Sequence, residues 1–288
     1  MPAPPNKDEI VGSGSTPSNA TARSGFAKLW ECLFGTSGLL GANGTVAAAR
    51  AALGFGTAGP FSNRNLVNNR TLTINTRSKA GTVVLAAGVY GHDQWKAGAA
   101  GCTYTFATVG IDVVITITSG SLVHVIHGPK VEGGVYVASW SGTSQAKLNG
   151  AAYAASGVTV SGVGAGSNLP IEMGPGTFTR VQVEQGTAVT TFDRRTPAIE
   201  LFECQKYLET GSGELQAYNT ASNGTAVRIP FKATKWTTPT MTYTIAANTN
   251  CTVFDARTPT PDGVTWYCTP TTTGTVAWIG SWMASCEL

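Results

Sequence analysis

Two histidines lie close together in the chain and have the right residue type to hold a metal ion. They fall in Leu122-Val-His-Val-Ile-His127, an apolar, Val-rich run that is typical of a β-strand. Successive side chains of a strand point to opposite faces, so a spacing of three residues separates His124 from His127. Metal ligands must converge on one point. We therefore predict no metal site at these histidines.

Carboxylates are the second group that could carry chemistry, because a pair of them roughly 5 to 9 Å apart can hydrolyse a glycosidic bond. The candidates are Asp93, Glu132, Glu172, Glu184 and Asp193, and nothing in their spacing pairs any two. The chain also lacks a Gly-x-Ser-x-Gly elbow, a Gly-x-x-x-x-Gly-Lys phosphate-binding loop and a Gly-x-Gly-x-x-Gly run that follows a strand. We predict that the protein is not an enzyme and has no catalytic, cofactor-binding or metal site.

The six cysteines form no CxxC pair and no zinc spacing. Cys32, Cys102 and Cys204 are predicted to be isolated buried thiols. Cys251, Cys268 and Cys286 lie within 36 residues and could include one disulfide, although an odd trio argues against a planned framework.

Aromatic residues near the end of the chain are the best binding candidates. A flat ring packs well against the C–H face of a sugar, and Tyr and Trp dominate binding hot spots. The alternative is that the rings fill a small β-core, which is favoured for any one of them alone. As a group, we predict a receptor-binding surface made by Trp236, Tyr243, Trp266, Tyr267, Trp278 and Trp282.

The elements that must position these residues are strands. Short Val/Ile/Thr-rich runs separated by Gly, Asn and Ser favour an all-β protein, and 42% apolar with 12% charged residues excludes a disordered or coiled-coil chain. Over 61–209 we predict a β-sandwich or jelly roll. Its expected strands are 82–85, 111–118, 122–126, 135–140, 158–160 and 177–184.

A helix should close this sandwich at 196–208. Thr196 suits the N-cap and Pro197 the first turn, and Ala198, Leu201, Phe202 and Leu208 would share one apolar face. The following 210–288 segment differs in composition, with 18 Thr in residues 220–288. Because Thr and aromatic residues favour strands, we predict a second, smaller β-domain there.

The first 60 residues are predicted to be an attachment segment. Residues 1–24 are rich in Pro and polar residues and form an extended arm. The helix expected at 24–35 carries an apolar stripe that could cover its own sandwich, but its place behind the arm favours another subunit or particle protein. That stripe comprises Phe26, Leu29, Trp30, Leu33 and Phe34. A second short helix at 45–53 has the spacing of a small coiled coil, as at a symmetry axis.

Charge and hydropathy exclude two classes of partner. The net charge is +3, and no cluster of Lys and Arg interleaves with aromatic residues, so we expect no nucleic-acid binding. No apolar run approaches the roughly 20 residues that span a bilayer, so we expect no membrane insertion.

Several motifs resemble the sandwich domain of bacteriophage tail-fibre proteins, over about residues 44 to 209. The strongest is a strand and helix pair, with shorter matches before it. These motifs are Gly176-Thr-Phe-Thr-Arg-Val-Gln-Val-Glu-Gln-Gly186, Thr191-Phe-Asp193, Glu200-Leu-Phe-Glu-Cys-Gln-Lys-Tyr207, Asn63-Arg-Asn-Leu-Val-Asn68, Tyr90-Gly-His-Asp-Gln-Trp95 and Val135-Tyr-Val-Ala-Ser-Trp-Ser-Gly142. His92 and Gln94 depart from the family pattern, which leaves the ligand open.

The resemblance implies a jelly-roll-like β-sandwich domain and a homotrimer on the exterior of a phage particle, and it does not imply catalysis. The expected function is a tail fibre that attaches to other virion proteins of the baseplate, tail or capsid through residues 1–60 and binds a host-surface glycan through 210–288. One alternative is a capsid-decorating or baseplate fibre without receptor binding. A polysaccharide depolymerase is the third.

Overall fold

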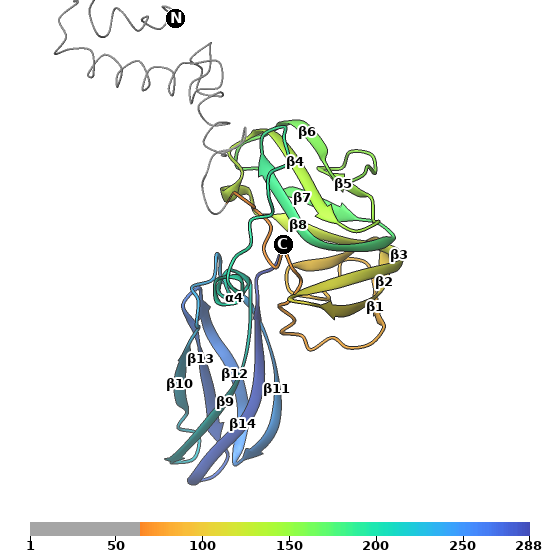
Figure 1. Ribbon diagram of the computed structural model, residues 1–288. Helices are drawn as coiled ribbons and strands as arrows, with labels where there is room; N and C mark the ends of the chain where they lie inside the picture. The colour runs from red at the N-terminus through yellow and green to blue at the C-terminus, as the bar shows by residue number, and fades with distance from the viewer. Residues whose placement is uncertain (1–63) are drawn as a thin grey trace, which may run out of the picture.

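The protein is an all-β sandwich protein, as the strand patterns predicted. The computed structural model describes residues 64–288, which form two stacked bodies of antiparallel strands with one helix between them (Figure 1). The predicted attachment segment, with its arm, its two short helices and Cys32, lies outside the described residues. Within 64–288, no helix has the length and apolar character needed to cross a bilayer.

The first sandwich contains eight strands. Its main path runs β1-β2-β3-β8-β4-β6, and β7 joins β3 to β5. Their bounds are β1 Val83–Leu85, β2 Trp95–Val109, β3 Asp112–Ile126, β4 Gly134–Ser141, β5 Ala146–Leu148, β6 Val158–Val163, β7 Leu169–Met173 and β8 Gly176–Gln185, with a 3-10 turn, η2, at Gly128–Lys130. Alternate residues of these strands face one core, which contains Trp95, Tyr104, Ile115 and Phe178.

One long strand links the two layers of the first sandwich. The predicted strands 111–118 and 122–126 are a single strand, β3, which pairs with β8 through 115–117 and with β7 through 122–126. Gly120, at φ +72°, allows the chain to continue, and a β-carbon there would collide with the carbonyl oxygen of Gly101 on β2. A glycine is therefore required where β2 and β3 shift register.

The second sandwich packs two three-stranded sheets, β11-β14-β9 and β10-β13-β12. Its strands are β9 Leu208–Asn219, β10 Thr225–Pro230, β11 Thr240–Thr249, β12 Cys251–Thr260, β13 Gly263–Pro270 and β14 Gly274–Ser285. A disulfide joins Cys251 to Cys268, and Cys286 is a free buried thiol. Cys102 and Cys204 are also free and buried, as predicted.

The predicted helix is present as α4, Pro197–Gln205, preceded by Thr196 at the N-cap. Its orientation contradicts the prediction. Leu201 and Phe202 are 36% and 47% exposed, and the buried side chains are Glu200 and Cys204. The reason is that the carboxylate of Glu200 binds the buried guanidinium of Arg70, which turns the apolar face of the helix toward solvent.

The chain returns to the first sandwich after β14, so its C-terminal end lies between the two bodies (Figure 1). Glu287 pairs with Arg77 and accepts a hydrogen bond from the backbone N–H of Gln94 at 3.0 Å. Lys96 donates to the carbonyl oxygen of Leu288 at 2.6 Å. These contacts join the C-terminal residues, which follow β14, to β2 and to the loops before β1 and β2.

Candidate functional site

Three of the six aromatic residues predicted to bind a receptor are core residues. Trp266, Trp278 and Trp282 are 0%, 1% and 6% exposed. They lie on the inward faces of β13 and β14, where they pack with Phe231 and Phe254. Period-two alternation places them inside together with Val264 and Val276. The predicted receptor surface is therefore wrong for Trp266 and Trp278, whereas Trp282 is a core residue that also lines a hollow on the sheet β11-β14-β9.

Trp236 lies at the junction of the two sandwiches. Its ring packs edge-on against His127, 4.3 Å between centroids, and its Nε1–H donates to the carbonyl oxygen of Cys286 at 2.6 Å. The side chain is 42% exposed. Trp236 therefore contributes to the contact between the two bodies while part of its side chain stays exposed to solvent.

Tyr243 and Tyr267 keep part of their rings at the surface. Tyr243 lies on the edge strand β11, is 41% exposed, and donates its hydroxyl to the carbonyl oxygen of Phe254 at 3.2 Å. Tyr267, on β13, is half-buried beneath the guanidinium of Arg257, 3.5 Å from the ring centroid. Both remain candidate binding residues.

A concave surface of the second sandwich lies on the sheet β11-β14-β9. This hollow, the second-sandwich hollow, has a volume of about 420 Å³. Strand register explains it, because Met283 pairs with Thr242 on one side and with Thr210 on the other, and Ser281 pairs with Thr244. It is lined by Thr210, Gly211, Thr242, Tyr243, Thr244, Ser281, Trp282 and Met283.

The chemistry of this hollow is that of a hydroxyl-binding surface. Thr242, Thr244 and Ser281 are exposed, and each hydroxyl can both donate and accept a hydrogen bond. Met283 adds a flexible apolar surface between them. The lining contains no carboxylate, cation or histidine. Such a surface can hold a polyhydroxylated ligand but offers no general acid or base.

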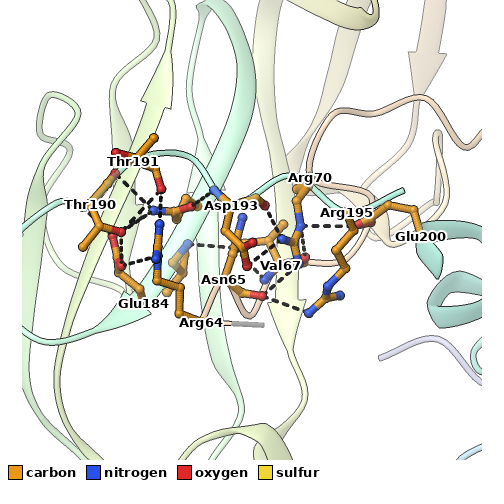
Figure 2. Close-up of polar contacts among 12 residues, drawn as sticks. Arg64, Asn65, Val67, Arg70, Glu184, Thr190, Thr191, Asp193, Arg195 and Glu200 are labelled. Atoms are coloured by element: carbon orange, nitrogen blue, oxygen red, sulfur yellow. Dashed lines mark hydrogen bonds and ion pairs between the residues drawn. The ribbon is translucent and has the colours of Figure 1, made fainter. Parts of the chain in front are cut away.

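Two of the predicted carboxylates belong to a buried polar network of the first sandwich (Figure 2). Glu184, on β8, accepts hydrogen bonds from the backbone N–H of Thr190 at 2.9 Å and from Gln182 at 2.8 Å, and it pairs with Arg64. Asp193 pairs with Arg70 at 3.3 Å. These acids hold the loop after β8 in place.

The same network explains the strand-and-helix motif. The side-chain oxygen of Gln182 accepts from the backbone N–H of Asp193 at 2.8 Å, and Glu200 accepts from the backbone N–H of Asn69 at 3.0 Å. Cys204 is fully buried one turn later. The polar residues of the motif therefore satisfy buried backbone groups and join β8 to α4, which is a structural role.

The remaining predicted carboxylates are separate from this network. Asp93 is buried and accepts from the backbone N–H and hydroxyl of Thr76, both at 2.9 Å. Burial, the largest influence, raises the pKa of Asp93 although these hydrogen bonds oppose it. Glu132 is exposed, and Glu172 lies on β7 beside Tyr153.

The two histidines have different environments. His124 is buried in the first sandwich, 5.2 Å from Trp95 between ring centroids, whereas His127 lies beyond the end of β3 and faces Tyr207 and Trp236. Within residues 64–288, no three His, Cys, Asp or Glu side chains gather closely enough to hold a metal ion.

The hydroxyl residues of the second-sandwich hollow were not predicted. Their signal is present in the alternation of β14, where buried Val276, Trp278 and Trp282 alternate with outward Ala277, Ile279 and Ser281. The prediction was based on the aromatic residues, and on β14 these occupy the inward-facing positions. The predicted particle-docking residues Phe26, Leu29, Trp30, Leu33 and Phe34 lie outside the described residues.

Comparison with known proteins gives no family. No protein-family model matches the chain, and no curated protein matches it. Among solved structures, the chain is similar to wild-type discoidin II from Dictyostelium discoideum, with 9% identity, 79% of this chain and 93% of that chain covered, and a TM-score of 0.25. A structure of recombinant discoidin II from the same organism gives 10% identity, 78% and 93% coverage, and a TM-score of 0.23.

Proposed function

We propose that this chain is a structural protein of a bacteriophage particle, a homotrimeric tail fibre that binds a host-surface glycan through its second sandwich. Two features support the proposal. The motifs over residues 44–209 resemble tail-fibre sandwich domains, and the second-sandwich hollow presents the hydroxyls of Thr242, Thr244 and Ser281 around an apolar floor. The proposal that the chain binds a glycan rests on this hollow, because its Thr and Ser side chains can form hydrogen bonds with sugar hydroxyls.

Attachment would depend on avidity rather than on one strong site. Single sugar contacts are weak, but several copies on one rigid particle strengthen binding, by roughly 100-fold or more where the geometry permits simultaneous contact. In this proposal residues 1–60 attach the fibre to other virion proteins, through Phe26, Leu29, Trp30, Leu33 and Phe34, and the first sandwich supports the trimer.

A matched pair of variants tests the glycan site. Ser281→Arg places a long charged side chain in the hollow, whereas Thr275→Arg places the same side chain on the same outward face of β14, outside the hollow. On an array of bacterial surface polysaccharides, the full chain should bind at least one glycan, Ser281→Arg should weaken that binding at least tenfold, and Thr275→Arg should retain it. Equal binding by both variants would overturn the site.

Separate measurements test whether the chain is a trimer, whether residues 1–35 attach it to the particle, and whether it is an enzyme. Light scattering should give three times the 29.8 kDa of one chain, and a clean monomer would contradict the fibre. Deleting residues 1–35 should abolish attachment to the particle and leave a folded trimer. A capsid-decorating fibre without receptor binding is favoured if no glycan is bound, and release of reducing ends from a host polysaccharide would instead indicate a depolymerase.

A further inference from the structure

A second hollow lies on the first sandwich, at the end of β7 next to β5. It has a volume of about 330 Å³ and is lined by Thr143, Gln145, Tyr153, Gly174 and Pro175. This volume is at the lower end of the range for small-molecule sites, about 300 to 1,000 Å³. We call it the Tyr153 hollow. Its lining contains no predicted receptor residue and no residue of the second sandwich.

The Tyr153 ring is held in a fixed position while 38% of the residue stays exposed. Its hydroxyl donates to Oε1 of Glu172 at 2.9 Å, and the Ser121 hydroxyl donates to the same oxygen at 2.7 Å. Its ring also lies against Gly174, where an added β-carbon would come within 3.0 Å of Cε1. A ring fixed before binding loses little conformational entropy when a ligand arrives.

The charges behind the ring are mutually satisfied. Lys147 pairs with Glu172 at 3.5 Å, and its ammonium lies 4.5 Å from the Tyr153 ring centroid. Burial, then the hydrogen bond to Glu172, raises the pKa of Tyr153 to about 12, so the hydroxyl stays protonated as a donor. The hollow itself is lined by uncharged side chains, which favours a neutral ligand.

The side-chain amide of Gln145, at the rim of the hollow, has open hydrogen-bonding capacity. Gln145 is exposed, and its side-chain amide makes no hydrogen bond with the described part of the chain. The backbone below it is fixed, because Gly174 N–H donates to the Gln145 carbonyl oxygen at 2.9 Å and Thr143 exchanges hydrogen bonds with Thr177. An amide next to an aromatic ring suits a ligand with hydroxyls around a C–H face.

We infer that the Tyr153 hollow is a second carbohydrate-binding site, which takes one neutral pyranose unit against the Tyr153 ring, with Gln145 and Thr143 binding its hydroxyls. The inference extends the proposed function, because a polymeric glycan could then contact both sandwiches of one chain. Two linked weak sites bind a repeating polymer more tightly than either site alone.

Saturation-transfer NMR on the full chain tests this inference, with the methyl glycosides of glucose, galactose, mannose and N-acetylglucosamine as probes. Tyr153→Ala should reduce the signal of the bound glycoside at least fivefold. Tyr153→Phe should retain it, because the ring remains and only the hydrogen bond to Glu172 is lost. Tyr218→Ala, which removes a tyrosine that is 73% exposed on β9, is the matched control and should have no effect.

Crossing these variants with Ser281→Arg separates the two sites. Loss of signal in Tyr153→Ala but not in Ser281→Arg supports the Tyr153 hollow and removes the second-sandwich hollow from the proposed function. Loss in Ser281→Arg but not in Tyr153→Ala overturns this inference and leaves the proposed function intact. If the wild-type chain gives no signal with any of the four glycosides, the Tyr153 hollow is not a pyranose site.

Discussion

Arg70 and Glu200 form a buried ion pair, with Nε of Arg70 3.1 Å from Oε1 of Glu200 and 0% and 3% of the two side chains exposed. The Arg70 guanidinium also donates to the carbonyl oxygens of Val67 and Asn65, at 3.3 Å and 2.9 Å. The pair joins the start of the described chain to the helix between the two sandwiches (Figure 2). Its loss should therefore disturb the whole first sandwich.

Glu200→Ala should lower the free energy of unfolding by about 2–5 kcal/mol, because it removes one of the two carboxylates that pair with the buried Arg70 guanidinium and leaves the backbone N–H of Asn69 without its acceptor. The matched control is Glu203→Ala on the same helix. Glu203 pairs with Lys206 and Lys130, whose side chains are 36% and 27% exposed, so its removal should cost under about 1 kcal/mol. Urea unfolding followed by circular dichroism measures both, and equal losses would contradict a structural role for the pair.

The fold class and the position of α4 were predictable because they depend on local signals. Alternation predicts strands, and Thr196-Pro197 predicts the start of the helix. The direction in which the helix faces was not predictable in this way. It depends on Arg70, which lies 130 positions before Glu200 in the chain, and no local pattern shows that contact.

The candidate site was harder to predict than the fold, because it depends on strand register. Thr210, Thr242 and Met283 come from three separate strands and line one hollow only because β14 pairs with both β9 and β11. Composition pointed instead to the tryptophans, which are large enough to serve either as a core or as a binding surface. Which of the two they serve is decided by the face of the strand on which each one lies.

Replacing one buried and one partly exposed tryptophan should lower the free energy of unfolding by different amounts. Trp278→Ala should cost about 3–5 kcal/mol, because it opens a cavity between the sheets of the second sandwich. Trp236→Ala should cost about 1–2 kcal/mol, since its ring is 42% exposed and its loss removes chiefly the hydrogen bond to Cys286 and the contact with His127. Thermal or urea unfolding can rank them, and the reverse order would refute the assignment.

The contact made by Glu287 should couple the unfolding of the two sandwiches. Its side chain is 1% exposed and pairs with Arg77 of the first sandwich, so Glu287→Ala leaves a largely buried cation unpaired, at a cost of about 2–5 kcal/mol. Scanning calorimetry should show one transition for the wild type and two for the variant. Glu214→Ala, at an exposed position on β9, is the control and should change neither the number of transitions nor their midpoints.

Two buried histidines should make the first sandwich sensitive to mild acid. The Nδ1–H of His124 donates to the carbonyl oxygen of Gln94 at 3.0 Å, and its Nε2 faces the backbone N–H of Asn68 at 3.4 Å, so only the neutral ring fits. Burial lowers the pKa of His124 from 6.5 to about 3. Burial likewise lowers the pKa of His92, which contacts the Tyr104 hydroxyl, to about 4.

His124→Gln should make stability less dependent on pH. Below pH 6.5 the unfolded chain protonates His124 while the folded chain does not, so the free energy of unfolding falls by roughly 2 kcal/mol between pH 7 and pH 5 through this residue alone. In the variant, the free energy of unfolding should lose this part of its dependence on pH. The other titrating groups are present in both proteins, so their contributions cancel when the two pH dependences are subtracted. Urea unfolding at pH 7, 6 and 5 measures it. The partly exposed His127→Gln should change the slope less, and an equal change in both variants would show that burial of His124 is not the cause.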